Sequence, residues 1–127
     1  MSRKVIASPD APAAFGPYSQ AIEIDGFVFC SGSLGADPAS GDLLEGIENQ
    51  TERSLLNIEA ILASVGMTMG DVVKCTVFLS DLANFNKMNA VYKTHVIAPP
   101  PARSTVQVAA LPHDALVEIE AIARRSN

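Results

Sequence analysis

The amino-acid sequence predicts an α+β fold in which a single mixed β-sheet carries two helices packed on one face. Three observations predict it. The hydrophobic patterns follow the order strand, strand, helix, strand, helix, strand, strand; an Asp-Gly dipeptide joins the first two strands; and the 127-residue length suits one domain. With 48% hydrophobic and 18% charged residues, the chain can bury one core without a disulfide or a metal ion. We therefore expect a single domain over residues 1–127.

The first two strands form a predicted hairpin. Apolar-rich runs over residues 20–24 and 27–31 are joined by an Asp-Gly dipeptide. This dipeptide is a strong signal of a two-residue turn, because a type I′ turn requires positive φ at both of its central positions. The turn sets a register in which Gln20 faces Ser31. It also brings Tyr18 and Ser31 together at the open end of the hairpin.

The middle of the chain alternates helical and strand patterns. From residue 47 to residue 65, apolar residues recur at spacings of three and four, which is one face of an α-helix. Residues 72–79 form a nearly continuous apolar run, which is typical of a buried strand. Ser80 and Asp81 then offer an N-cap for a second helix. The inner side of this helix carries Phe85, Met88 and Tyr92.

The last two strands are expected to pair with each other. Residues 104–110 and 117–123 both alternate between two faces, and turn residues separate them, so we expect an antiparallel hairpin. In that pairing Arg103 lies within reach of Glu120 and diagonally toward Glu118. All three would occupy the sheet face away from the helices. Since a guanidinium fork suits bidentate binding of a carboxylate, this face is a candidate site; the alternative is a solvated face with incidental ion pairs.

Composition excludes several classes of partner. The formal net charge is −5, and no Lys or Arg occurs between Lys4 and Arg53, so a broad cationic surface for nucleic acid is not expected. No apolar run approaches the length of a membrane-spanning helix, so no membrane partner is expected either. The basic N-terminus is followed by too few apolar residues for a signal peptide, which favours a cytoplasmic protein.

The sulfur and imidazole side chains do not predict a metal site. Cys30 and Cys75 each lie inside an apolar, β-branched run, where a buried free thiol is expected. His95 and His113 fall in different predicted elements, and no Cys/His cluster has ligand spacing. We therefore expect no metal site.

Several motifs follow one another along the chain and together resemble a known family. The motifs are GPYSQA at residues 16–21, FCSG at 29–32, VVKCTVF at 72–78, MNAVY at 88–92, PARST at 101–105, and LP at 111–112 leading to VEIEA at 117–121. In this order and at this spacing, over residues 9–123, they closely resemble the RidA/YjgF reactive-intermediate deaminase family. The family's order of elements also agrees with the order predicted from periodicity.

The resemblance implies a fold, an assembly and an activity. It implies a chorismate-mutase-like subunit that forms a homotrimer with three clefts between subunits. The implied activity is cofactor-free hydrolysis of short-lived enamine and imine acids, such as 2-aminoacrylate with its tautomer 2-iminopropanoate, and 2-iminobutanoate. The products would be the 2-oxo acid and ammonia.

The resemblance also implies roles for individual residues. Arg103 resembles the arginine that binds the substrate carboxylate, and Glu118 resembles the glutamate that orients or activates water. The hairpin register instead favours Glu120 as the nearer partner of Arg103; we follow the resemblance and regard Glu120 as a structural charge. The remaining substrate-binding positions match Tyr18, Ser31, Asn89 and Thr105.

Three positions depart from the family's pattern. Ser33 stands where the family often has Gln, which changes one contact at the edge of the pocket. Thr105 stands where some members carry Cys, so an essential thiol is not expected and the backbone amide would act there. His95 begins the His-Val pair that replaces a usual aromatic pair near the rim of the cleft, which bears on substrate breadth.

Two other functions fit parts of the pattern. The first is a non-catalytic, regulatory trimer that binds small carboxylates in the same Arg103 pocket. The second is an endoribonuclease or translation inhibitor. The net charge of −5, together with the lack of a basic stripe or a His pair for acid–base work, disfavours RNA as a substrate.

Overall fold

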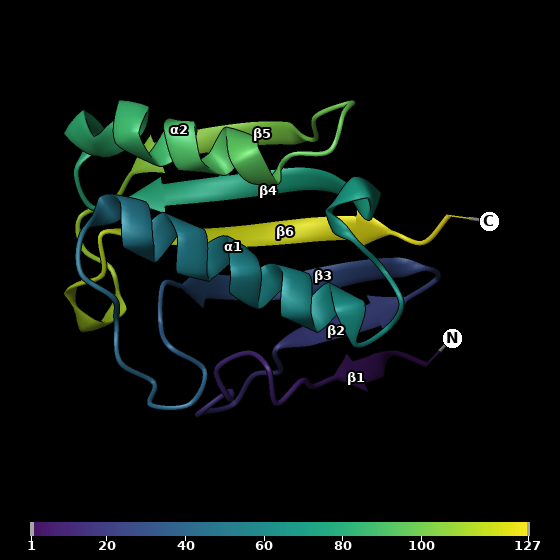
Figure 1. Ribbon diagram of the computed structural model, residues 1–127. Helices are drawn as coiled ribbons and strands as arrows, with labels where there is room; N and C mark the ends of the chain where they lie inside the picture. The colour runs from purple at the N-terminus through teal and green to yellow at the C-terminus, as the bar shows by residue number, and fades with distance from the viewer. Residues whose placement is uncertain (1, 127) are drawn as a thin grey trace.

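The computed structural model describes residues 2–126, so the two ends of the predicted domain, Met1 and Asn127, lie outside the described residues. It confirms the predicted α+β class: one six-stranded mixed sheet, in the order β1-β2-β3-β6-β4-β5, carries both helices on one face (Figure 1). The main elements are β1 (Lys4–Ile6), β2 (Ala21–Ile24), β3 (Phe27–Leu34), α1 (Ile47–Ala63), β4 (Val72–Leu79), α2 (Phe85–His95), β5 (Ala102–Gln107) and β6 (Val117–Arg124).

The β2–β3 hairpin forms in the predicted register. Asp25 and Gly26 both have positive φ, at 53° and 80°, as a type I′ turn requires. Beyond the last strand pair, the backbone N–H of Ser31 donates to the carbonyl of Gln20 at 3.0 Å. Strand β1, which pairs antiparallel with β2, was not predicted, because three residues are too few to show a period of two.

The predicted hairpin between the last two strands is wrong. Strand β5 pairs in parallel with β4, and β6 lies between β3 and β4. Helix α2 forms the crossover that returns the chain parallel to β4. Strand β6 takes a central place because its alternate residues Val117, Ile119, Ala121 and Ala123 are all buried.

The corrected strand order moves Arg103 to the other face of the sheet. Arg103 aligns with Cys75, and Cys75 aligns with Ala121, so all three share the face that the helices cover. Glu118 and Glu120 alternate with the buried residues of β6 and lie on the opposite face. The expected proximity of Arg103 to either glutamate within one chain is therefore wrong.

A polar seam joins helix α1 to the end of β3. Ser33 Oγ donates to the carbonyl of Ser54 at 2.9 Å, and Ser54 Oγ donates to the carbonyl of Ser33 at 2.7 Å. The Asn57 amide donates to the carbonyls of Leu34 and Ala36 at 3.2 and 2.9 Å. Because these groups are buried, each lost partner would cost about 1–3 kcal/mol. The seam therefore holds the end of β3 in one position against α1.

The two cysteines are buried and free, as predicted. Cys30 and Cys75 both align with Ala121, which places them two strands apart, beyond the reach of a disulfide. Burial, together with the neighbouring Cys75 thiol, raises the pKa of Cys30 to about 12, so this sulfur stays a thiol at neutral pH.

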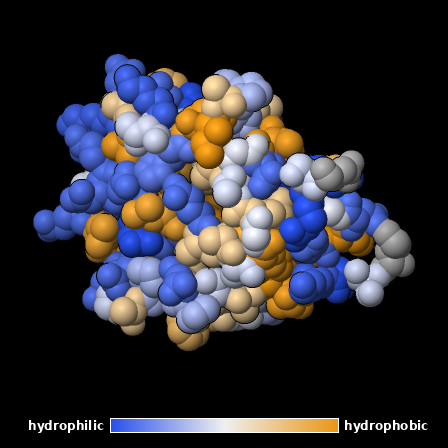
Figure 2. Space-filling model, turned by 45° about the vertical axis from the view of Figure 1, so that its right-hand side comes forward, coloured by the Kyte–Doolittle hydropathy of each residue, from blue (hydrophilic) through white to orange (hydrophobic). Residues whose placement is uncertain are grey.

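The two faces of the molecule differ in polarity. Polar residues predominate on the helix side, at the left of the view in Figure 2. The uncovered sheet face carries an apolar row in which Val5, Ile22, Phe29 and Ile122 align across four strands. Of these, Val5 and Phe29 are 63% and 44% exposed. Neither helix in the described part of the chain has the length and apolar character needed to cross a bilayer.

His95, the last residue of α2, joins α2 to α1. Its Nε2 lies 2.7 Å from Glu52 Oε1, and its Nδ1 lies 2.5 Å from Glu59 Oε2. Because ionised carboxylates only accept hydrogen bonds, both ring nitrogens donate and the ring is the imidazolium. Burial lowers the pKa of His95, but the hydrogen bonds and charges of the two glutamates outweigh it, so its pKa is raised overall.

We expect the His95 contacts to make stability depend on pH. The folded-state pKa of His95 lies above its ordinary value of 6.5. The two contacts therefore contribute their full stabilisation below pH 6.5, and this stabilisation is lost as the pH rises through the folded-state pKa. In urea unfolding, His95→Gln should lower the free energy of unfolding by about 1 kcal/mol at pH about 6 and by much less at pH about 9. A difference from the wild type that does not change with pH would contradict this expectation.

Candidate active site

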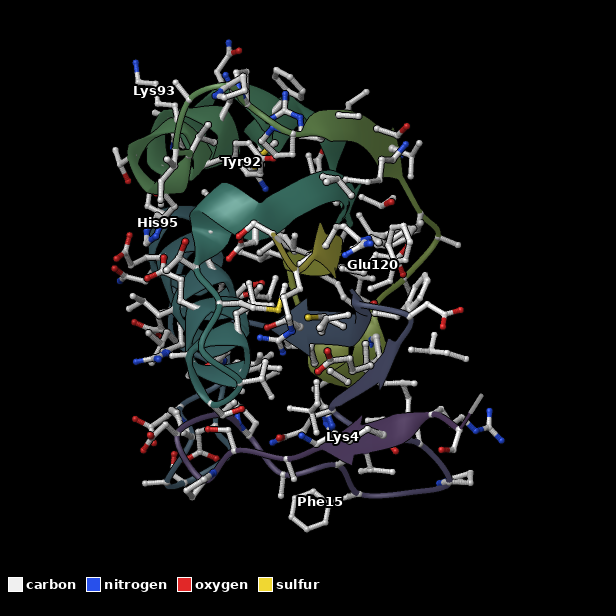
Figure 3. All side chains as sticks on the ribbon, turned by 90° about the vertical axis from the view of Figure 1, so that its right-hand side faces the viewer. Lys4, Phe15, Tyr92, Lys93, His95 and Glu120 are labelled. Atoms are coloured by element: carbon white, nitrogen blue, oxygen red, sulfur yellow. The ribbon has the colours of Figure 1, made fainter. Side chains whose placement is uncertain are left out.

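A hollow of about 510 Å³ lies at the open end of the β2–β3 hairpin. Tyr18, Ser31 and Glu118 all line it, which confirms that the hairpin brings Tyr18 and Ser31 together. Phe15, 86% exposed, also lines the hollow and lies close to the β1 edge of the molecule in Figure 3. The hollow therefore combines aromatic surface with one carboxylate.

A β-bulge sets the direction of Ser31. The register between β3 and β6 shifts between Cys30 and Ser33, so Ser31 and Gly32 together oppose one position of β6. Such an extra residue bends a strand and redirects its side chains. Here the Ser31 hydroxyl donates to the carbonyl of Ser19 at 2.6 Å, which fixes the side chain at the wall of the hollow.

Gln20 holds the chain segment that forms the opposite wall. Its buried amide donates to the carbonyls of Ser8 and Pro12 at 3.1 and 2.7 Å, and its carbonyl accepts from the backbone N–H of Ser8 at 2.6 Å. Pro12 and the adjacent Ala11 both line the hollow. The sequence analysis missed this role of Gln20; the signal in the sequence is a polar residue at the start of an apolar-rich run, directly before β2.

Glu118 is the carboxylate of the hollow. Burial raises the pKa of Glu118, and the negative charge of the neighbouring Glu120 raises it further. A carboxylate with a raised pKa is a stronger base than an exposed one, which suits it to take a proton. The side chain lies against Gly32, where an added Cβ would stand 2.5 Å from Glu118 Oε2.

We expect Gly32→Ala to lower activity without unfolding the protein. The three atoms nearest the new methyl group would be Oε2, Cδ and Cγ of Glu118, a flexible side chain that can rotate away, so the carboxylate would be displaced. Turnover should fall about tenfold or more, and the melting temperature should change little. Gly35→Ala is the matched control, because its Cβ would stand 2.4 Å from backbone atoms of Gln50 and should destabilise the fold instead. Full activity in Gly32→Ala would contradict the expectation.

Arg103 belongs to a second group of residues, on β5 and α2. Its Nη1 donates to Asn89 Oδ1 at 2.7 Å. Its guanidinium carbon lies 4.6 Å from the centre of the Tyr92 ring and 5.6 Å from the centre of the Phe85 ring. Thr105, two residues along β5 on the same face, has a buried hydroxyl with no hydrogen-bond partner among residues 2–126. This group gathers three of the predicted site residues.

The predicted site residues thus form two separate groups within one chain. Tyr18, Ser31 and Glu118 line the hollow, whereas Arg103, Asn89 and Thr105 do not. In Figure 3, Tyr92, whose ring lies against Arg103, is on the helix side of the sheet, and Glu120 is on the other side. We name these sets the Glu118 group (Tyr18, Ser31 and Glu118) and the Arg103 group (Arg103, Asn89 and Thr105).

Both histidines have positions that the sequence did not specify. His113, in a short 3₁₀ turn over Pro112–Asp114, is exposed and also lines the hollow. His95 is engaged by two glutamates between the helices. Within residues 2–126, no three His, Cys, Asp or Glu side chains are arranged to hold a metal ion.

Comparison with known proteins gives the chain a family. The sequence model described as "Endoribonuclease L-PSP" matches residues 8–125. A 2-iminobutanoate/2-iminopropanoate deaminase from Mus musculus is 47% identical over 122 residues, which cover 95% of this chain and 90% of that protein. The chain belongs to the RidA/YjgF family. The resemblance seen in the sequence motifs is thereby confirmed.

Solved structures of RidA/YjgF relatives share the whole fold. A Rid-family protein from Yersinia pestis superimposes with a TM-score of 0.94 at 45% identity and covers 97% of this chain and 99% of its own. The TdcF protein of E. coli, solved with bound serine, superimposes with a TM-score of 0.92 at 43% identity, with coverage of 97% and 99%.

Proposed function

We propose that the protein is a hydrolytic deaminase of enamine and imine acids that works as a homotrimer of chorismate-mutase-like subunits. Relatives that carry the name 2-iminobutanoate/2-iminopropanoate deaminase support this reaction. The observation that carries the proposal is the division of the site. One chain holds an arginine ready for a carboxylate in the Arg103 group and a raised-pKa carboxylate in the Glu118 group, on opposite faces of one sheet.

A second copy of the chain would complete the site. In a closed ring of identical subunits, the Arg103 group of one copy faces the Glu118 group of the next, so three equivalent sites form. The uncovered apolar row of Val5, Ile22, Phe29 and Ile122 suits burial between copies, since such a row is costly to leave in water. Burial of this row would drive the assembly that creates the sites.

The Arg103 group would bind and orient the substrate. An imine acid is small and anionic, so a bidentate contact between its carboxylate and Arg103 supplies most of its orientation. Asn89 occupies one side of the guanidinium, which leaves the remaining N–H groups for the ligand. The unpartnered hydroxyl of Thr105 and the backbone beside it offer a further contact.

The Glu118 group would carry out the hydrolysis. The Glu118 carboxylate takes a proton from water while the water oxygen bonds to the imine carbon, and the C=N π electrons move to nitrogen. That proton then passes to the nitrogen and gives a carbinolamine. The hydroxyl proton next moves through the Glu118 carboxylate to the amine, the C–N bond breaks, and ammonia leaves as the carbonyl forms. One imine and one water thus give one 2-oxo acid and one ammonia, with Tyr18 and Ser31 lining the cavity.

The direct test supplies the unstable substrate enzymatically. A PLP-dependent dehydratase acting on serine generates 2-aminoacrylate, and release of pyruvate is followed with and without the protein. Acceleration by the wild type and its loss in Arg103→Ala would support the proposal. No acceleration, or an undiminished rate in Arg103→Ala, would contradict it; binding of 2-oxobutanoate without turnover would indicate a binding protein instead.

A mixing experiment tests the division of the site between subunits. Arg103→Ala and Glu118→Ala chains, each inactive alone, are unfolded together at equal amounts and refolded. If each site uses two subunits, roughly one site in four receives both intact residues, and roughly a quarter of wild-type activity returns. Mixed chains that stay inactive although light scattering shows trimers would contradict a shared site.

A further inference from the structure

Residues along one face of helix α2 contact the guanidinium of Arg103. Phe85, Asn89 and Tyr92 are spaced at four and three residues and therefore share one face of the helix. All three contact the same guanidinium: Asn89 through a 2.7 Å hydrogen bond, Tyr92 and Phe85 through their rings. The sequence analysis placed Phe85 and Tyr92 on the inner side of the helix and gave neither a role at the site.

Tyr92 is the more closely placed of the two rings. Its centre lies 4.6 Å from the guanidinium carbon, against 5.6 Å for Phe85, and Tyr92 is 6% exposed whereas Phe85 is only half-buried. A guanidinium above a desolvated ring is attracted to the π face and is held parallel or tilted to it. The Tyr92 ring therefore limits how the fork of Arg103 can turn.

The hydroxyl of Tyr92 does not explain why the ring is there. It is buried and has no oxygen or nitrogen partner among residues 2–126; its neighbour is the thiol of Cys75. Burial, with the Cys75 contact, raises the pKa of the Tyr92 hydroxyl well above its ordinary value, so the ring stays neutral. What Tyr92 offers the site is thus the face of its ring, over which the Arg103 guanidinium lies.

We propose that Tyr92 is a positioning residue for carboxylate binding, acting through Arg103. This inference rests on the proposed function. Its ring and the Asn89 carboxamide together fix the plane and one edge of the guanidinium, so the free edge meets a carboxylate without further ordering. Fixing the donor before binding reduces the entropy lost when ligand arrives, which strengthens the affinity for substrate and product alike.

The competing explanation is that Tyr92 only fills the core beneath α2. Met88 provides the matched comparison, because it lies on the same helix and is fully buried, yet it makes no contact with Arg103 that resembles those of the helix face that carries Tyr92. Removing either side chain should loosen the packing of α2. Only removal of the Tyr92 ring should change how Arg103 binds a carboxylate.

The experiment compares Tyr92→Phe, Tyr92→Leu and Met88→Ala with the wild type in the trimer. Measured are the dissociation constant of 2-oxobutanoate by calorimetry, KM and kcat for imine hydrolysis, and the melting temperature. We expect Tyr92→Leu to raise both the dissociation constant and KM about tenfold, with kcat changed much less. Tyr92→Phe, which keeps the ring, should bind like the wild type within about twofold.

The outcomes separate this inference from the proposed function. If the wild type binds 2-oxobutanoate through Arg103 but accelerates no imine hydrolysis, the proposed function fails. The dissociation constants of the variants still test the role of Tyr92 in that case. If Met88→Ala weakens binding as much as Tyr92→Leu, or if Tyr92→Leu binds normally, the positioning role is wrong. A loss in Tyr92→Phe equal to that in Tyr92→Leu would assign the effect to the hydroxyl and would also overturn it.

Discussion

Arg103→Lys is expected to lower kcat/KM for imine hydrolysis about 10³-fold, nearly as much as Arg103→Ala. Lysine keeps the charge but loses three features that the structure displays: the planar fork, the hydrogen bond to Asn89, and the face that stacks on Tyr92. An ammonium in this position would bind a carboxylate only as a point charge. Steady-state kinetics with dehydratase-generated 2-aminoacrylate measures the effect.

Arg124→Lys is the control for this prediction. Arg124 also lies over an aromatic ring, 5.1 Å from the centre of Phe27, but it belongs to neither group of site residues. Its replacement should leave kcat/KM within about twofold of the wild type. Activity in Arg103→Lys above about a tenth of the wild-type value would show that charge alone suffices, and would contradict the role given to the fork.

Glu118→Gln is expected to lower kcat about 10²- to 10³-fold while KM changes little. Glutamine has nearly the same shape but cannot take a proton from water, so binding at Arg103 should survive while hydrolysis fails.

In the wild type, kcat should fall as pH drops through the pKa of Glu118, which burial and Glu120 hold above the ordinary 4.5. Measurements of kcat across acidic and neutral pH test this fall.

Glu120→Gln separates the two glutamates. Removing the Glu120 charge removes one of the causes that raise the pKa of Glu118, so the acidic limb of kcat should move to lower pH while the maximal rate is kept. An inactive Glu120→Gln beside an active Glu118→Gln would reverse the assignment.

Most of the local structure could be predicted because it is encoded by neighbouring residues. Asp25-Gly26 defines the first hairpin through its two positive φ angles. Apolar spacing over residues 47–65 predicts a helix that is observed as Ile47–Ala63. The Asp81 side chain accepts a hydrogen bond from the N–H of Ala83 and caps the 3₁₀ turn Leu82–Asn84. It is not the cap of α2 that was predicted, because α2 begins at Phe85, after Asn84, and has no side-chain cap. Each of these features depends on contacts only a few residues apart.

The pairing of the last two strands could not be predicted in the same way. A period of two shows which residues share a face of a strand but does not name the neighbouring strand. Antiparallel pairing of β5 with β6 and parallel pairing of β5 with β4 both satisfy that period. The choice depends on the α2 crossover and on the full burial of one face of β6, which favours a central position for that strand.

The candidate site, too, could be predicted only where it depends on residues close together in the sequence. The hairpin register predicted Tyr18 and Ser31 as neighbours, and the structure places both at one hollow. The motifs could not show that Arg103 points toward α2, because that direction follows from its alignment with Cys75. Nor could they reveal Tyr92 as a support for Arg103, since a buried aromatic residue on a helix is usually core.

The sequence by itself therefore determined the fold class, the first hairpin, both helices and the family to which the chain belongs. These rest on short-range dihedral preferences and on residue types at particular positions. Only the tertiary structure decided the strand order, and with it the placement of Arg103 and Glu118 on opposite faces of one sheet. The reason is that strand order is settled by competition for burial among segments far apart in the chain, which no local pattern records.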